Sequence, residues 1–181
     1  MELMGCTAII YQSKYGSTEK YAKWLCEEIG GDLYKKSEIS ISDLKKYDTI
    51  IYGGGLYITG IAGFSFIKNN YKHLEDKNII VFAVGASPFD TGLIFEIKGN
   101  NFPDEMKYIP CFYLRGAFDE SKIKSRDKIL MQLLKKFIGK KDDSDYEEWE
   151  KAFIESTRKS EDWTCKESLK PIIEYINLKY E

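Results

Sequence analysis

The chain has 181 residues, 43% hydrophobic and 31% charged, a composition typical of one globular domain with a substantial core. Its formal net charge of -2 argues against general nucleic-acid binding, because phosphate backbones select for clustered positive charge. No apolar run approaches the roughly 18 residues needed to cross a bilayer, and the amino terminus lacks the basic start and long apolar core of a signal peptide.

The cysteines indicate a reducing compartment. They lie far apart in the sequence, at Cys6, Cys26, Cys111 and Cys165, and none forms a C-x-x-C pair. Cys6 and Cys111 fall in expected buried strands, and Cys26 falls in an expected helix. We therefore predict packed, reduced thiols in a cytoplasmic protein. A zinc site is not expected, because the chain has one histidine and no ligand spacing.

The first half of the chain alternates short apolar runs with amphipathic stretches. The first helix has Tyr21, Trp24, Leu25 and Ile29 on one face and stops at Gly30-Gly31. The expected elements are a strand, this helix, a weak strand, a turn, a second buried strand and a second helix. They cover residues 6–11, 21–29, 32–36, 42–47, 48–52 and the stretch from Ile61 on.

The second half contains two more strands and several helices. The strands cover residues 78–84 and 111–115, and residues 89–108 are expected to be mostly loop because glycine, asparagine and proline interrupt any period. Helices are expected over residues 121–138, from a capping box at Ser144-x-x-Glu147, and over Trp163–Tyr180. The expected cap of the last helix is Thr164 with Glu167, with Pro171 in its first turn or at a kink.

Apolar strands that alternate with amphipathic helices predict a parallel sheet covered on both faces. Ligands of such sheets bind beyond the carboxyl ends of the strands. Three predicted loops follow those ends, at residues 13–18, 53–60 and 85–90. The first is rich in hydroxyls, the second offers glycines for close backbone approach and Tyr57 for stacking, and the third has small residues that leave room for a planar ring.

The first loop is Ser13, Lys14, Tyr15, Gly16, Ser17 and Thr18. It joins a strand to a helix N-terminus, where free N–H groups and the helix dipole favour a phosphate. Ser17 or Thr18 could equally be an ordinary N-cap. This stretch alone leaves both interpretations open, and the other two loops favour the phosphate because they lie at the same predicted edge.

The spacing of residues in the loops argues against other kinds of binding or catalytic site. The first loop has neither the G-x-x-x-x-G-K-[ST] spacing of P-loop NTPases nor the G-x-G-x-x-G dinucleotide fingerprint. No acid–base constellation is visible at the predicted edge: Asp90 is expected to cap or shape a loop, and His73 to be structural. A phosphate cradle with a stacking aromatic and no general base favours a bound redox cofactor that performs the chemistry itself.

These motifs resemble those of flavodoxins. Residues 13–18 resemble the [ST]-x-x-G-x-T phosphate loop, residues 47–54 the entry to the second flavin loop, and residues 84–87 the third loop. The resemblance implies a flavodoxin-like α/β three-layer sandwich with a five-stranded parallel sheet in the order 2-1-3-4-5, formed by the single domain 1–181. It also implies non-covalent FMN, with its phosphate on Ser13 to Thr18. The isoalloxazine would be flanked by two sets of residues: Gly55, Leu56, Tyr57 and Ile58, and Gly85, Ala86 and Ser87.

The stretch Arg115-Gly116-Ala117-Phe118 and the lysine-rich helix after it resemble flavodoxin-domain proteins related to menaquinone-dependent protoporphyrinogen oxidase. This branch implies oxidation or reduction of a small molecule such as a porphyrinogen or quinone, while flavodoxins in general imply electron transfer between proteins. The chain departs from electron-carrier flavodoxins in its nearly balanced charge, and residues 89–108 contain no segment identifiable with the long insertion of the oxidase.

The expected partners are therefore a redox protein or a small electron donor or acceptor, and no nucleic acid. The helix within residues 121–141 is either an ordinary amphipathic helix with a solvated basic face or a contact for an anionic membrane surface or acidic partner. The alternative to a flavoprotein is a flavodoxin-like binding or scaffold module that has lost its flavin.

Overall fold

The computed structural model describes residues 6–57, 60–122, 125–138, 146, 150–151, 154 and 160–180. Its main sheet has the parallel order β2-β1-β3-β5-β6, with the short β4 added antiparallel to β3. The parallel order confirms the predicted flavodoxin-like 2-1-3-4-5 arrangement. The strands are β1 (Thr7–Gln12), β2 (Asp32–Lys35), β3 (Thr49–Tyr57), β4 (Gly60–Ile61), β5 (Asn78–Gly85) and β6 (Cys111–Arg115), with β7 (Ala117–Phe118) and β8 (Glu161–Asp162) in a separate ribbon.

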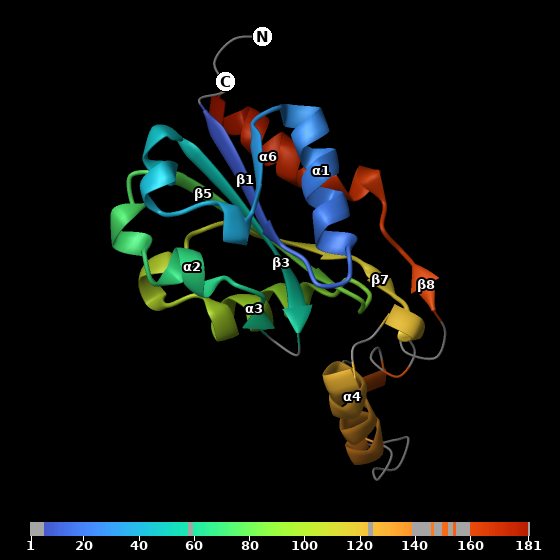
Figure 1. Cartoon of the computed structure of the whole chain (residues 1–181). Coiled ribbons are helices and arrows are strands. Elements are labelled where there is room, and N and C mark those ends of the chain that lie inside the picture. The colour runs from blue at the N-terminus through green and yellow to red at the C-terminus, as the bar shows by residue number, and fades with distance from the viewer. Residues whose placement is uncertain are drawn as a thin grey trace.

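Helices cover both faces of the sheet, as Figure 1 shows. On one face lie α1 (Ser17–Ile29) and α6 (Lys170–Tyr180), and on the other α2 (Ser65–Lys68) and α3 (Thr91–Asn101). A further helix, α4 (Ser125–Ile138), lies apart from both layers. Among the described residues, no helix combines the length and apolar character needed to span a bilayer.

Two cores form because successive side chains of a strand point to opposite faces of the sheet. In β1, Ala8 and Ile10 join the core under α3, whereas Ile9 and Tyr11 join the core under α1 and α6. β5 alternates in the same way through Val81 and neighbouring residues. The continuous apolar runs of the sequence are thus strands buried on both faces.

The stretch expected to be loop over residues 89–108 contains α3, so that prediction was wrong. Asp90 caps the helix by accepting a hydrogen bond from the N–H of Gly92 at 3.1 Å, which confirms its expected capping role. Ile97 is buried in the core, and Leu93 and Ile94 pack against it. Gly92 and Gly99 interrupt the apolar period in the sequence, but tertiary packing of this short stripe outweighs their low helix propensity.

The predicted second loop was also partly wrong, because Gly53 to Tyr57 continue β3 and form a hairpin with β4. The glycines in it allow close packing. A methyl group on Gly53 would lie 2.1 Å from Cζ of Phe82, and one on Gly54 would lie 2.4 Å from Cγ2 of Ile61. The helix expected from Ile61 is shortened accordingly to α2 and a 3-10 turn at Tyr71–His73.

Helix boundaries near the carboxyl terminus differ from the sequence expectation as well. The last helix begins with a 3-10 turn at Lys166–Leu169, preceded by Cys165, so Thr164 is not its cap. Pro171 lies in the first turn of α6, as expected. The helix expected over 121–138 is described as helical from Ser125. The capping box at Ser144 and Glu147 lies outside the described residues, and the single-domain assignment of residues 1–181 stays a prediction.

We expect Gly53→Ala to destabilise the fold by about 1–3 kcal/mol, because its methyl group would overlap the buried ring of Phe82. Urea unfolding followed by circular dichroism measures the change. Gly99→Ala is the matched control: nothing lies within 4 Å of its added methyl group, and helix propensity predicts stabilisation by about 0.5–1 kcal/mol. Equal stability of the two variants would contradict this account of Gly53.

The four cysteines are free thiols, but Cys6 and Cys165 are exposed and not packed as expected. Burial raises the pKa of the Cys111 thiol to about 12, although nearby Lys98 acts in the opposite direction. Little of Cys111 is therefore thiolate at about pH 8. With iodoacetamide and mass spectrometry on the folded protein, we expect the exposed Cys6 and Cys165 to be alkylated well before Cys111. All four should react together in urea, and early labelling of Cys111 in the folded protein would contradict its burial.

Candidate functional site

The three predicted loops meet at one edge of the sheet. In the strand register, Gln12 of β1 lies beside Gly54 of β3, and Gly55 lies beside Val84 of β5. Gly85 in turn lies beside Arg115 of β6. The residues that follow these strand positions therefore emerge side by side, at the carboxyl edge where parallel sheets bind ligands.

The first loop presents the N-terminus of α1 without a side-chain cap. The N-cap residue is Gly16, in the left-handed region at φ 101°, so Ser17 and Thr18 belong to the helix and the ordinary N-cap interpretation is wrong. The first intrahelical bond runs from the N–H of Lys20 to the carbonyl of Gly16 at 2.9 Å. The N–H groups of residues 17–19 thus precede the helical ladder, and nothing lies within 4 Å of a methyl group built on Gly16.

The serine hydroxyls of this loop are held in place by backbone donors. The N–H of Gly16 donates to Oγ of Ser13 at 3.0 Å, and the N–H of Ala117 donates to Oγ of Ser17 at 3.0 Å. Each hydroxyl still has its own O–H to donate. Thr18 is almost fully buried. The donor set consists of hydroxyls and N–H groups at a helix N-terminus, which matches the needs of a phosphate.

Lys14 and Tyr15 join the first loop to two distant segments. Both side chains bind the carboxylate of Asp127 in α4, Lys14 by an ion pair and Tyr15 by a hydrogen bond from its hydroxyl. The hydrogen bond with Asp127 is the main reason that the pKa of Lys14 is raised. The Tyr15 and Tyr57 rings meet edge to face with centroids 6.3 Å apart, and Nζ of Lys14 lies 5.6 Å from the Tyr57 ring centre.

The second group of predicted residues lies in the β3–β4 hairpin. Leu56 pairs with Ile61, and the carbonyl of Gly55 accepts a hydrogen bond from the N–H of Ala62 at 2.9 Å. The Tyr57 side chain keeps 37% of its surface exposed. Partial burial, with smaller contributions from Tyr15 and Asp127, raises the pKa of Tyr57 to about 12, so its phenol is neutral near pH 7. Ile58 lies outside the described residues.

The third loop is held by side chains of β6. Arg115 Nε donates to the carbonyl of Ala86 at 3.1 Å, and the Tyr113 hydroxyl donates to the carbonyl of Ser87 at 2.7 Å. A methyl group on Gly85 would lie 2.8 Å from the Tyr113 oxygen, so the absence of a side chain there admits this phenol. The ring of Phe89 lies 6.5 Å from that of Tyr113 and is largely exposed. Tyr113 is thus an aromatic residue at this loop that sequence reasoning missed.

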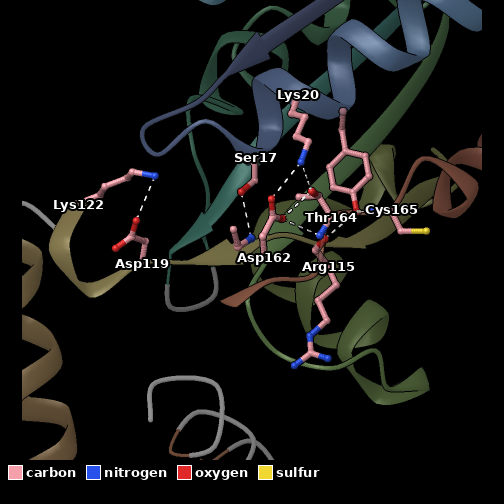
Figure 2. Close-up of polar contacts among 10 residues, drawn as sticks. Ser17, Lys20, Arg115, Asp119, Lys122, Asp162, Thr164 and Cys165 are labelled. Atoms are coloured by element: carbon pink, nitrogen blue, oxygen red, sulfur yellow. Dashed lines mark hydrogen bonds and ion pairs between the residues drawn. The ribbon is translucent and has the colours of Figure 1, made fainter. Parts of the chain in front are cut away.

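A cluster from distant parts of the chain lies against the start of α1 (Figure 2). Lys20 binds Asp162 at 3.0 Å and Oγ1 of Thr164 at 2.6 Å. The guanidinium of Arg115 lies 4.0 Å from the centre of the Trp163 ring. The residues of this cluster lie far apart in the sequence and meet only in the folded chain. The sequence alone therefore does not indicate that they are neighbours. The cluster fixes the strand of residues 161–162 beside β7, next to the first loop.

The three loops offer neutral hydrogen-bond donors and aromatic surfaces. The carboxylates beside them are each paired with a lysine. Asp127 pairs with Lys14, and Asp162 pairs with Lys20. Within the described part of the chain, no group of three or more histidine, cysteine, aspartate or glutamate side chains could hold a metal ion. The arrangement is therefore suited to holding an anionic group and a flat ring.

Two hollows on the described surface lie elsewhere. One is lined by residues around β2, including Tyr34 and Lys46, and the other by residues that include Asn78 and Tyr175. Neither hollow is lined by residues of the three loops. The candidate site is therefore defined by the loops at the carboxyl edge of the sheet.

Similarity to known proteins agrees with this geometry. A sequence model described as Flavodoxin domain matches residues 8–145. An uncharacterised protein of Methanocaldococcus jannaschii is 30% identical over 94 aligned residues, which cover 38% of this chain and 63% of that relative. The chain thus matches slightly less than two thirds of this relative's length.

Solved structures of low identity were also found. The chain is similar to a flavodoxin, WrbA-like protein of Agrobacterium tumefaciens, with a TM-score of 0.44 and 21% identity over 59% of this chain and 82% of that one. A flavoprotein of Lactobacillus acidophilus, solved in complex with FMN, has a TM-score of 0.42 and 16% identity over 62% of this chain and 93% of that one.

We expect Asp127→Asn to lower the pKa of Lys14 toward its ordinary value, because the charged hydrogen bond that raises it would be weakened. Lysine titration by NMR measures this shift. The stability loss should stay below about 1 kcal/mol, because solvent screens an ion pair of which both side chains remain partly exposed. Asp104→Asn, which removes the partner of Lys107, is the matched control and should leave Lys14 unchanged. An unshifted Lys14 in Asp127→Asn would show that the pair does not form in solution.

Proposed function

We propose that this chain, which belongs to the Flavodoxin domain family, binds FMN non-covalently at the carboxyl edge of its sheet and works as a redox protein. The observation that carries the proposal is the open N-terminus of α1, with Gly16 as N-cap and hydroxyls of the first loop around it. The other two loops emerge from neighbouring strands at the same edge. An FMN phosphate and ring could therefore be held by loops that the sheet register keeps adjacent.

In this proposal the phosphate is held by Ser13, Lys14, Tyr15, Gly16, Ser17 and Thr18 through their hydroxyls and N–H groups. The ring is flanked by Gly55 to Tyr57 at the end of β3, together with Ile58, and by Gly85 to Ser87 after β5. Tyr57 supports this assignment because its ring is partly exposed and tied to the first loop through Tyr15. FMN itself would supply the electron-transfer chemistry, and the protein residues would bind and orient it.

The reaction that we propose is electron transfer that needs no proton-transfer group of the protein. The carboxylates beside the loops support this, because Asp127 and Asp162 are each engaged with a lysine. The electron partner is then either another protein or a small molecule such as a quinone or porphyrinogen. Mixing the flavin-loaded protein anaerobically with candidate proteins and with small molecules distinguishes these two alternatives. The electron partner is the one that bleaches or restores the flavin absorbance.

We also propose a cytoplasmic location, supported by the free state of all four cysteines. Free thiols are typical of proteins in a reducing compartment. Fractionation of the source cells with an antibody against the chain tests the location.

The site itself is tested by FMN titration followed by flavin fluorescence. We expect Ser13→Ala and Thr18→Ala each to weaken FMN binding about tenfold, the effect of one lost hydrogen bond to a charged group. Ser65→Ala, in α2 on the other side of the sheet, is the matched control and should bind FMN as the parent chain does. Circular dichroism of Thr18→Ala checks that loss of a buried side chain has not unfolded the protein.

Two results would overturn the proposal. If purified protein neither retains FMN nor binds it when added, the chain is a flavodoxin-like module without flavin. If both loop variants bind FMN unchanged, the phosphate lies elsewhere.

A further inference from the structure

Helix α4 exposes two large apolar side chains one turn apart. Ile129 is 57% exposed and Leu133 is 60% exposed. Residues four positions apart lie on the same side of a helix, so these side chains form one continuous apolar ridge. An apolar ridge on a helix that lies apart from the two layers of the fold has a cost in water and calls for an explanation (Figure 1).

The ridge lies away from the side of α4 that contacts the first loop. Asp127 pairs with Lys14 of that loop and so marks the inner side of the helix, and the fully buried Ile138 lies on the same side. At about 100° per residue, Ile129 lies roughly 160–180° and Leu133 roughly 120–140° from that side. The contacts of Asp127 with Lys14 and Tyr15 therefore set the direction of the ridge. Rotating α4 to turn the ridge inward would break these contacts.

Basic side chains border one side of the ridge. Lys128 and Lys136 are exposed on the same outer half of the helix, together with the polar Gln132. Across the whole of α4 the sequence has four basic residues and one acidic residue, and that acidic residue is the inward Asp127. The outer half thus combines an apolar ridge with positive charge along one side of it.

We propose that this outer half of α4, defined by Lys128, Ile129, Gln132, Leu133 and Lys136, binds the surface of an anionic lipid bilayer. Helices that lie in the bilayer interface bury apolar side chains at the boundary of headgroups and acyl chains, while lysines reach the anionic headgroups. The 14 residues of α4 are too few to span a bilayer, so the helix lies on the surface. A partner surface that is only acidic would use the lysines but would leave the apolar ridge unexplained.

The placement of α4 connects this surface to the loops. Asp127 lies on the same helix and holds Lys14 and Tyr15 of the first loop. A bilayer bound by α4 would therefore keep that loop close to the lipid, which is the location of a quinone-type electron partner. This last step rests on the proposed FMN function, whereas bilayer binding by α4 does not.

Flotation of the full chain with lipid vesicles tests the proposal. We expect binding to vesicles of phosphatidylcholine mixed with phosphatidylglycerol, and little binding to phosphatidylcholine alone. Lys128→Glu with Lys136→Glu should weaken binding at least about tenfold, because two attractions to the anionic surface become repulsions. Ile129→Ser with Leu133→Ser should also weaken it about tenfold, by loss of apolar burial.

The matched control variants make the same kinds of substitution, lysine to glutamate and leucine to serine, on other parts of the surface. Lys68→Glu with Lys72→Glu makes the same change of net charge at exposed positions of another segment, and Leu178→Ser removes an exposed leucine of α6. Both should bind vesicles as the parent does. Absence of flotation with anionic vesicles at low salt would overturn the proposal, as would equal losses in the control variants. Salt-sensitive binding to immobilised polyglutamate without flotation would also overturn it, in favour of an acidic partner. FMN titration of the same variants keeps this test separate from that of the flavin site.

Discussion

The candidate site depends on the fixed position of β1 in the sheet. The strand is paired with β2 on one side and β3 on the other, and its side chains enter both cores. A shift of one residue would exchange every side chain between the two cores, so the register is strongly specified. The loop after Gln12 therefore starts from a fixed point, and Gly16 can open α1 toward the edge of the sheet without a capping side chain.

Glycines at this edge serve two physical purposes that look alike in a sequence. Gly16 has a positive φ and open space beside it, so it shapes a loop that can receive a ligand. Gly53 and Gly54 have no room for a methyl group, because Phe82 and Ile61 fill that space. Gly116 is similar, with Cγ1 of Val84 only 2.9 Å from where its methyl group would lie. A glycine-rich stretch after a strand thus indicates close approach, but the neighbour can be a side chain of the protein itself.

The parts of the structure that could be predicted are those set by local pattern. Buried β-branched runs such as residues 78–84 predicted the strands, whereas the strand order came from the resemblance to flavodoxins. The first loop followed from hydroxyls and a glycine between a strand and a helix. Helix α3 could not be predicted, because its apolar stripe is short and interrupted by glycine. Asp127 could not be predicted either, since it lies 113 positions from Lys14 and nothing local marks it. The sequence predicted Thr164 to be a helix cap. Its hydroxyl instead accepts a hydrogen bond from Lys20 and donates one to Asp162.

The charges of the first loop indicate which of its groups would bind an anion. Lys14, the loop's one cation, already pairs with Asp127 and lies over the rings of Tyr15 and Tyr57. Its positive charge is largely compensated before any ligand arrives, so it contributes little net attraction to a phosphate. The remaining donors are neutral hydroxyls and the N–H groups at the start of α1, whose partial positive charge is directed at the open side of Gly16. Lys14 acts chiefly as a connector that ties α4 and the β3–β4 hairpin to the loop, and the helix N-terminus is the part that would bind the anion.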